Sequence, residues 1–472
     1  MPAPNCQTVK EHVIIVGAGL VGTLWAALLG RRGYRVDVYE KRPDMRRVGF
    51  VGGRSINLAL SDRGWKALRL AGLEEKIRSM ALPMEGRMMH DETGRLSFHP
   101  YGLEGQAIYS VSRGGLNLEL LHKAAAYDQV QFHFEHKCLE VDPESGTLQF
   151  EDLRTGKVVS AQADLIFGAD GAYSAVRQAL QKRPRFNFSQ QYLEHGYKEL
   201  TIPPGPNGEH LLDNIALHIW PRHSFMLIAL PNLDGSFTCT LFLPFEGENA
   251  FEHLNTEAEV RAFFKQWFPD AVPLLPDLTR DFFTNPTSTL VTIRCKPWTA
   301  AGRVLLIGDA AHAIVPFYGQ GMNAGFEDCS LLDECIDTCA GNWPEIFRRF
   351  NASRIEDADA IADLALRNFI EMRDRVADPR FLLRKEIERW LHKQHPRDFI
   401  PVYSMVTFSH LPYRLALQES REQDRLFEHI LQIEGVEKDF QNEKVLAVFR
   451  QWLATRTESP YEKYRSLQEG AP

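Results

Sequence analysis

Residues 13–40 read VIIVGAGLVGTLWAALLGRRGYRVDVYE, and this stretch decides the fold. Residues 13–16 are all apolar, which is typical of a short strand buried on both faces. Residues 20–32 predict a helix that ends at Gly33, and residues 35–40 alternate as a second strand does. A strand, a helix and a strand in this order predict a βαβ unit within a parallel sheet.

The turn between the first strand and the helix carries Gly17, Gly19 and Gly22 in the spacing GxGxxG. Such glycines allow a tight turn and let a pyrophosphate approach the N–H groups at the start of the helix. Glu40, at the end of the second strand, can accept a hydrogen bond from a ribose hydroxyl. The pattern predicts dinucleotide binding without separating NAD from FAD. Residues 13–30 are long enough for a membrane span, but the early glycines favour the strand and helix.

Two later stretches repeat the order of strand, glycine turn and helix. Residues 164–177, DLIFGADGAYSAVR, predict a buried strand, a Gly-Ala-Asp-Gly turn and a helix. Residues 303–328, RVLLIGDAAHAIVPFYGQGMNAGFED, do the same and place Asp309 at the end of a strand. Its carboxylate can accept from a hydroxyl, and the helix that starts near Met322 can direct N–H groups toward a negative group.

Between these motifs the sequence changes character. Residues 185–295 alternate aromatic and aliphatic runs with Pro, Gly and Asn, which predicts an inserted antiparallel sheet. Residues 351–375 predict an amphipathic helix, and the chain from 376 onward is polar and mostly helical. We therefore expect a discontinuous first domain of residues 1–184 plus 296–375, a sheet domain of residues 185–295 and a helical cap of residues 376–472.

Composition limits the function. The net charge of −8 argues against a nucleic-acid-binding protein, and the seven scattered cysteines without framework spacing suit a reducing cytoplasm. We expect neither a secretion signal at the N-terminus nor an apolar anchor in residues 440–472. The sequence shows no metal-binding cluster and no catalytic triad. We expect a monomer or a homodimer.

Three motifs in this order resemble those of the class A flavoprotein aromatic hydroxylases, over roughly residues 12–375. The resemblance implies an α/β fold with an FAD-binding Rossmann-like domain of the glutathione-reductase type, an inserted antiparallel substrate sheet and a C-terminal helical segment. Shorter motifs resemble the branch of that family that hydroxylates L-kynurenine. They are GGRSINLALSDRG (52–64), MEGRMMH (84–90), YSVSRGGLNLELL (109–121), PFYGQGMNAGFEDC (316–329) and RNFIEMRDRV (367–376).

The resemblance implies a substrate site around Arg87, Tyr101, Asn368 and Tyr403. An arginine can bind a carboxylate with two hydrogen bonds, and tyrosine and asparagine side chains can complete the set. Without the resemblance, the arginine would be interpreted as a solvated surface residue, and each tyrosine as a core ring whose hydroxyl contacts water. The further substrate residues implied are Phe317, Glu371 and Met372.

The resemblance also implies tightly but non-covalently bound FAD. The cofactor-binding residues implied are Gly17, Gly19, Val21, Gly22, Tyr39, Glu40, Lys41, Arg42, Ala59, Arg113, Asp309, Gly321, Met322 and Asn323. Tyr318 stands where the family commonly has histidine. His312 is interpreted as a structural residue of the turn rather than a general base.

The implied activity is a flavin-dependent monooxygenase reaction. NADPH would reduce FAD, and a C4a-hydroperoxyflavin formed with O2 would convert L-kynurenine to 3-hydroxy-L-kynurenine. Because the flavin carries the chemistry, no catalytic side chain and no metal are expected. Two alternatives remain open from the sequence: a class A hydroxylase for another aromatic acid, and a flavoprotein that acts as a reductase or scaffold without hydroxylation.

Overall fold

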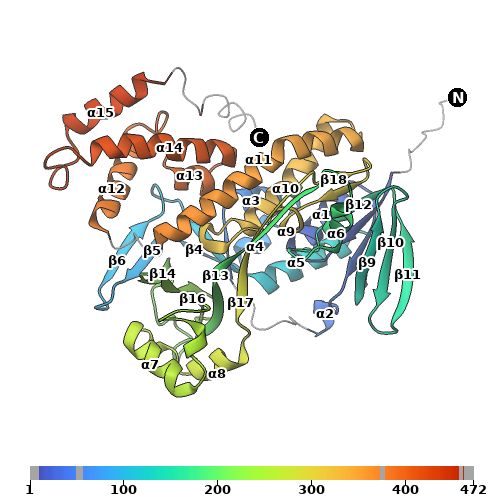
Figure 1. Ribbon diagram of the computed structural model, residues 1–472, viewed down its shortest axis with the longest axis horizontal. Coiled ribbons are helices and arrows are strands. Elements are labelled where there is room, and N and C mark those ends of the chain that lie inside the picture. Colours follow the sequence, from blue (N-terminus) through green and yellow to red (C-terminus); the bar gives the residue numbers. More distant parts are fainter. Residues whose placement is uncertain (1–9, 49–56, 373–377, 457–460, 462–472) are drawn as a thin grey trace.

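The computed structural model describes residues 10–48, 57–372, 378–456 and 461. Residues 52–56 and 373–376, which belong to two of the quoted motifs, lie outside the described residues. Figure 1 shows a parallel sheet packed with helices, a second long sheet, and a group of C-terminal helices at the other end of the molecule.

A six-stranded sheet in the order β18-β19-β12-β1-β2-β8 forms the centre of the first part. Strand β1 (His12–Val16) pairs in parallel with both β2 (Arg35–Glu40) and β12 (Leu165–Gly168). Its side chains are buried from Val13 onward, which explains the apolar run. The other strands are β8 (Val130–Phe134), β18 (Thr299–Ala300) and β19 (Val304–Leu306). The predicted α/β class with a parallel sheet is confirmed.

Four helices pack around this sheet and position the sites. Helix α1 (Leu20–Arg31) contacts α5 (Arg113–Ala125) and α10 (Gly321–Thr338). Helix α11 (Trp343–Ile370) begins at an Asn342 cap and contacts α10. Its first half belongs to the hydrophobic core that packs on the parallel sheet, and its second half to the hydrophobic core that packs on the second sheet. Helix α11 therefore joins the two cores.

Residues 130–142 form two strands. Glu135 has a positive φ of 60°, which turns the chain between β8 and the next strand. That strand, β9 (His136–Asp142), forms a three-stranded antiparallel sheet with β10 (Thr147–Asp152) and β11 (Lys157–Gln162).

The second sheet has seven strands in the order β17-β13-β16-β15-β14-β5-β6. Five come from the expected inserted segment: β13 (Asn187–Ile202), β14 (Ala216–Arg222), β15 (Phe225–Pro231), β16 (Phe237–Pro244) and β17 (Ser288–Lys296). The last two strands of this order, β5 (Gly86–His90) and β6 (Leu96–Pro100), come from the first segment, and β5 pairs in parallel with β14. The sheet is thus neither wholly antiparallel nor confined to residues 185–295, because strand partners far apart in the chain leave no local signal.

Helices α7 (Glu257–Trp267) and α8 (Leu278–Thr284) share an apolar core with one face of this sheet. A smaller sheet of β3 (Asn57–Leu60), β7 (Ile108–Ser112) and β4 (Ala81–Met84) connects the first part to it. The remaining short elements are α2 (Met45–Val48), α3 (Asp62–Leu70), α4 (Glu74–Arg78), α6 (Ala175–Gln181), α9 (Asp309–His312), η1 (Phe251–His253), η2 (Val272–Leu274) and η3 (Pro316–Tyr318).

The C-terminal helices are α12 (Pro379–Gln394), α13 (Val402–Thr407), α14 (Tyr413–Ile430) and α15 (Glu443–Ala454). Helix α14 packs along α11, and α13 and α15 pack on α14. Figure 1 shows α12 and α13 above the β5 and β6 edge of the second sheet. Within the part of the chain that the structure describes, no helix has the length and apolar character that a bilayer span requires.

Candidate active site

Two glycines of the first motif lie where the backbone leaves no room for a side chain. Gly17 has a φ of +105°, and a Cβ there would lie 2.4 Å from the carbonyl oxygen of Ala169 in the turn after β12. A Cβ on Gly22 would lie 2.0 Å from the carbonyl oxygen of Gly17. The first and second motifs therefore pack backbone against backbone, which only glycine permits at these positions.

The N-terminus of α1 faces free space. Its N-cap, Gly19, supplies no side-chain cap, and its first turn has no acidic residue. A Cβ on Gly19 would meet no described atom within 4 Å, so protein packing does not account for this glycine. The Glu40 carboxylate lies beside the same turn and accepts hydrogen bonds from the N–H groups of Ala18 at 2.8 Å and Arg42 at 2.9 Å. Open N–H groups and a fixed carboxylate fit the pyrophosphate and ribose of a dinucleotide.

The third motif adds a carboxylate and a second open helix end. Asp309 follows Gly308, whose φ is +59°, and its side chain is exposed. Desolvation by the surrounding protein nevertheless raises the pKa of Asp309, and the positive charge of Arg113 opposes this rise. Helix α10 begins at Gly321 without a side-chain cap or an acidic residue in its first turn. A hydroxyl-bearing chain and an electron-rich ring, as in the other half of FAD, fit this arrangement.

Some of the residues predicted to bind the cofactor point elsewhere. The Tyr39 ring is stacked between His133, at a centroid distance of 4.4 Å, and Phe150, at 3.9 Å. Its backbone, in contrast, contacts the glycine turn: the Tyr39 carbonyl accepts a hydrogen bond from the Gly17 N–H at 2.7 Å. Side-chain direction in β2 depends on the strands that pair beside it, which the motif alone does not reveal.

Asn323 is similarly committed to the protein. Its amide oxygen accepts from the Ser61 N–H at 2.9 Å, and its amide nitrogen donates to the carbonyls of Ala59 at 2.8 Å and Gly319 at 2.7 Å. These bonds fix β3 against the start of α10. Val21 and Met322 are half-buried at the same helix ends, whereas Lys41 and Arg42 are exposed after β2.

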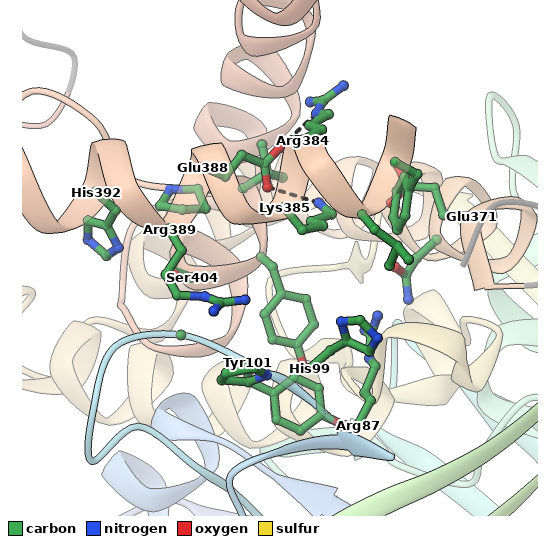
Figure 2. Close-up of a pocket in the computed structure, with 18 of the residues that line it drawn as sticks. Arg87, His99, Tyr101, Glu371, Arg384, Lys385, Glu388, Arg389, His392 and Ser404 are labelled. Atoms are coloured by element: carbon green, nitrogen blue, oxygen red, sulfur yellow. Dashed lines mark hydrogen bonds and ion pairs between the residues drawn. The ribbon is translucent and has the colours of Figure 1, made fainter. Parts of the chain in front are cut away.

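A cavity of about 130 Å³ lies between the second sheet and the C-terminal helices (Figure 2). Its wall comes from β5, the loop after β6, the end of α11, one face of α12 and the start of α13. Arg87, Tyr101, Asn368, Tyr403 and Glu371 all line it, so these residues, which are far apart in the chain, lie around one cavity. Met372 and Phe317 are buried directly behind its wall.

Arg87 lies among three tyrosines. Its guanidinium carbon is 5.3 Å from the Tyr101 ring centre and 5.2 Å from that of Tyr403. Tyr403 stacks between Tyr101 and Tyr318, with centroid distances of 5.2 and 5.5 Å. Burial raises the pKa of each of the three phenols, which therefore stay protonated at neutral pH.

Two polar atoms in this group have no hydrogen-bond partner among the described residues: Nε of Arg87 and the hydroxyl of Tyr101. Buried polar atoms are usually paired in folded proteins, so these two atoms are free to pair with a ligand in the cavity. A guanidinium and a hydroxyl donor together suit a carboxylate.

Asn368 connects the cavity to the third motif. Its amide nitrogen donates to the carbonyl of Phe317 at 2.7 Å and contacts Sδ of Met372 at 3.3 Å. The Phe317 ring stacks on Phe369 at 4.1 Å. Helix α11 thus holds η3, which lies in the chain between the Asp309 turn and the start of α10, against the cavity.

Glu371 lies one turn after Arg367, and the two side chains form an ion pair at 3.5 Å.

The turn at His312 is held by a buried ionic network. Asp328 accepts from the Gly308 N–H at 2.9 Å and lies 2.6 Å from Nε2 of His312. His312 also stacks on Trp298 at 5.1 Å, and Arg354 donates to the other Asp328 oxygen at 2.7 Å. These contacts are those of the structural residue expected from the sequence.

The structure adds wall residues that the sequence analysis did not select. They include Tyr318 and a charged face of α12 that comprises Arg384, Lys385, Glu388, Arg389 and His392. The available signal is spacing by four, in Arg384, Glu388 and His392 and again in Lys385 and Arg389. It does not distinguish a cavity wall from a solvated face.

Comparison with known proteins agrees with these features. The model of the FAD binding domain family matches residues 10–336. Kynurenine 3-monooxygenase of Flavobacterium psychrophilum is 50% identical over 439 residues, which cover 92% of this chain and 97% of that protein. The enzymes of that name from Myxococcus xanthus and Sus scrofa are 52% and 47% identical, over 87% and 86% of this chain and 88% and 86% of their own.

Solved structures share the fold at low identity. A 2-methyl-3-hydroxypyridine-5-carboxylic acid oxygenase superposes with a TM-score of 0.65 at 20% identity, covering 78% of this chain and 94% of that one. PqsL of Pseudomonas aeruginosa, described as a probable FAD-dependent monooxygenase, gives 0.61 at 20% identity, over 77% and 97%. The resemblance found in the motifs is confirmed at the level of sequence and fold. The chain contains an FAD binding domain in residues 10–336 and therefore belongs, with its relatives, to the kynurenine 3-monooxygenase family.

Proposed function

We propose that this protein is an FAD-dependent monooxygenase that hydroxylates L-kynurenine to 3-hydroxy-L-kynurenine, with NADPH and O2 as co-substrates. The observation that carries the proposal is the pair of orphaned polar atoms, Arg87 Nε and the Tyr101 hydroxyl, in a cavity next to the third cofactor motif. The names of relatives at about half identity over nearly the whole chain support it.

Substrate binding follows from the chemistry of the cavity. Arg87 would bind the carboxylate of the amino acid end through two N–H groups, and the hydroxyls of Tyr101 and Tyr403 would donate to the same group. The phenols can do so because their raised pKa values keep them protonated. Asn368 and Glu371, on α11, are placed to contact the amino group.

The aromatic end of the substrate would extend toward η3. Phe317 and Tyr318 are buried there, and Phe317 packs on Phe242 at 4.9 Å and on Phe369. This apolar wall would orient the ring and exclude water from the reacting carbon. Bound FAD, once reduced by NADPH, supplies the activation of O2 for transfer of one oxygen atom to the ring.

The cofactor would be held by the three motifs. We assign the pyrophosphate to the start of α1, the ribose to Glu40, the ribityl chain to Asp309 and the ring to the start of α10. Arg113, Ala59, Val21, Gly321 and Met322 would line the cleft, and Tyr39, Lys41, Arg42 and Asn323 would contribute through their backbone. The three domains remain as predicted in this proposal, with β5 and β6 added to the sheet domain.

The test is oxygen uptake by the purified protein with NADPH, with and without L-kynurenine. The proposal expects yellow protein, faster uptake with L-kynurenine and one 3-hydroxy-L-kynurenine formed per O2. Faster uptake with hydrogen peroxide as the only product would make it a non-hydroxylating flavoprotein. No response to L-kynurenine but a response to another aromatic acid would change the substrate.

We also propose that the enzyme acts in the cytoplasm. Its described cysteines are all free, as is usual in a reducing compartment. Fractionation of the native cells with antibody detection would test this location, and recovery with the membranes would contradict it.

A further inference from the structure

The cavity around Arg87 holds more positive charge than its own carboxylates neutralise. Three of its cations are paired: Arg367 with Asp424 and Glu371, Arg384 with Glu388 and Asp424, and Lys385 with Glu388 at 3.0 Å. These pairs use up the acidic side chains that line the cavity.

Among the described arginines that line the cavity, Arg87 and Arg389 are the two that form no ion pair with a carboxylate. Arg389 projects from the α12 face that lines the cavity and is half-buried. Figure 2 shows it on the α12 side, and Arg87 on the opposite side with Tyr101 and His99. A partly desolvated cation without a counter-ion is unfavourable. An anion that enters the cavity therefore gains favourable electrostatic interaction at both guanidiniums.

The pKa of His99 indicates that the guanidiniums of Arg389 and Arg87 both lie near this imidazole. Burial lowers the pKa of His99 first, the positive charges of Arg389 and Arg87 lower it further, and the negative charge of Glu386 opposes them. The pKa of one imidazole thus senses both guanidiniums. A neutral His99 adds no charge of its own to these two guanidiniums, one on the cap helix and one on the sheet.

We propose that Arg389 is a second carboxylate-binding residue, which captures the carboxylate of an incoming aromatic amino acid before Arg87 takes it over. The inference rests on the proposed function for the identity of the substrate. Arg389 lies on α12 and Arg87 on β5, so the two guanidiniums face the cavity from different elements. Arg87 alone would have to draw the carboxylate from water unaided.

The experiment compares Arg389→Gln with Lys393→Gln in the FAD-loaded enzyme. Lys393 lies one turn further along α12, is exposed and does not line the cavity, so its variant changes the same charge on the same helix. Stopped-flow absorbance of the flavin would measure association of L-kynurenine and of its deaminated analogue, 4-(2-aminophenyl)-4-oxobutanoate. The analogue carries a net negative charge, whereas L-kynurenine is a zwitterion.

We expect Arg389→Gln to slow association of the analogue about fivefold at low salt, with a smaller effect on L-kynurenine and convergence at high salt. The kcat at saturating L-kynurenine should stay unchanged. Equal association rates in the two variants would overturn the proposal, as would a lower kcat with normal association. If wild type binds the analogue but does not hydroxylate L-kynurenine, the proposed function fails while the role of Arg389 is still decided by the analogue.

Discussion

At the scale of single residues, the cofactor cleft depends on backbone conformations that few side chains tolerate. Gly17 combines a left-handed φ with a neighbouring carbonyl 2.4 Å from any Cβ. The carbonyl belongs to Ala169, in the second motif, so a shift of Gly17 would disturb two cofactor turns at once. The requirement for glycine is therefore steric and not a matter of hydrogen bonding.

Gly17→Ala should lower the free energy of unfolding by about 1–3 kcal/mol and leave the purified protein largely without FAD. Chemical denaturation and the absorbance ratio of flavin to protein measure the two effects. Gly156→Ala is the matched control, because Gly156 also has a positive φ, of +67°, but open space around its Cβ. A Gly17→Ala protein that retains as much FAD as the control would contradict the steric argument.

The residue scale also shows what the sequence can predict. Gly17, Gly22 and Glu40 were predicted because their roles depend on local backbone geometry within one βαβ unit. The directions of the Tyr39 and Asn323 side chains depend on strands and helices far away in the chain, and no local pattern contains that information. The pairing of Arg87 with Tyr101 and Tyr403 came from resemblance, since nothing in its own segment indicates a cavity.

At the scale of elements, the short helix α13 is held by a residue from the cofactor side of the molecule. Arg63, on α3, is buried with 1% of its surface exposed, and it forms an ion pair with Glu327 of α10. Its guanidinium donates to the carbonyls of Val406 at 3.1 Å and Leu411 at 2.5 Å. These carbonyls lie at and after the C-terminal end of α13, which carries Tyr403. Arg63 therefore positions a substrate residue from the cofactor domain.

Arg63→Lys keeps the charge beside Glu327 but loses the planar fork, so α13 should loosen. We expect the KM for L-kynurenine to rise about tenfold, with more hydrogen peroxide per NADPH and an unchanged FAD content. Arg177→Lys is the control, because Arg177 is equally buried but donates to carbonyls in the cofactor turns, Ala310 at 2.8 Å and Ala172 at 2.5 Å. It should weaken FAD binding and leave the KM unchanged. The same change of KM in both variants would show a general loss of packing.

Element order was predictable, whereas element partners were not. The βαβ unit, the turns at 168–171 and 308–309 and the long helix α11 follow from periodicity and glycine placement. The addition of β5 and β6 to the second sheet could not be predicted, because β5 pairs with β14 across more than a hundred residues of sequence. That pairing is what brings Arg87 to the cavity.

At the scale of the whole molecule, the first segment and the inserted sheet are joined by a buried imidazole pair. His218, on β14, donates from Nε2 to the carbonyl of Asp213 at 2.7 Å, and its Nδ1 lies 2.9 Å from Nε2 of His90 on β5. Because a carbonyl only accepts, Nε2 of His218 carries a proton, and the lowered pKa of the ring leaves Nδ1 as an acceptor for His90. Burial lowers the pKa of His218 to about 4.

This pKa shift predicts an acid-sensitive fold. The unfolded chain binds a proton on His218 below pH 6.5, while the folded chain does so only below about 4, so stability falls as the pH drops through this window. By linkage, the free energy of unfolding should be about 2 kcal/mol lower at pH 5 than at pH 8 from this group alone. Urea unfolding across the range measures it. His218→Gln should flatten this part of the profile, and an unchanged slope in that variant would assign the acid sensitivity elsewhere.

The central claim is that the Arg87 guanidinium binds the carboxylate of an aromatic amino acid beside the flavin. The most direct measurement is kcat/KM of wild type and Arg87→Gln with L-kynurenine and with its decarboxylated analogue, 3-amino-1-(2-aminophenyl)propan-1-one. The account predicts a loss of about 100-fold for L-kynurenine in the variant, since removing one partner of a buried charge pair costs roughly 3 kcal/mol. It predicts almost no loss for the analogue, which has no carboxylate. An equal loss for both compounds would show that Arg87 does not bind the carboxylate, and the account would be contradicted.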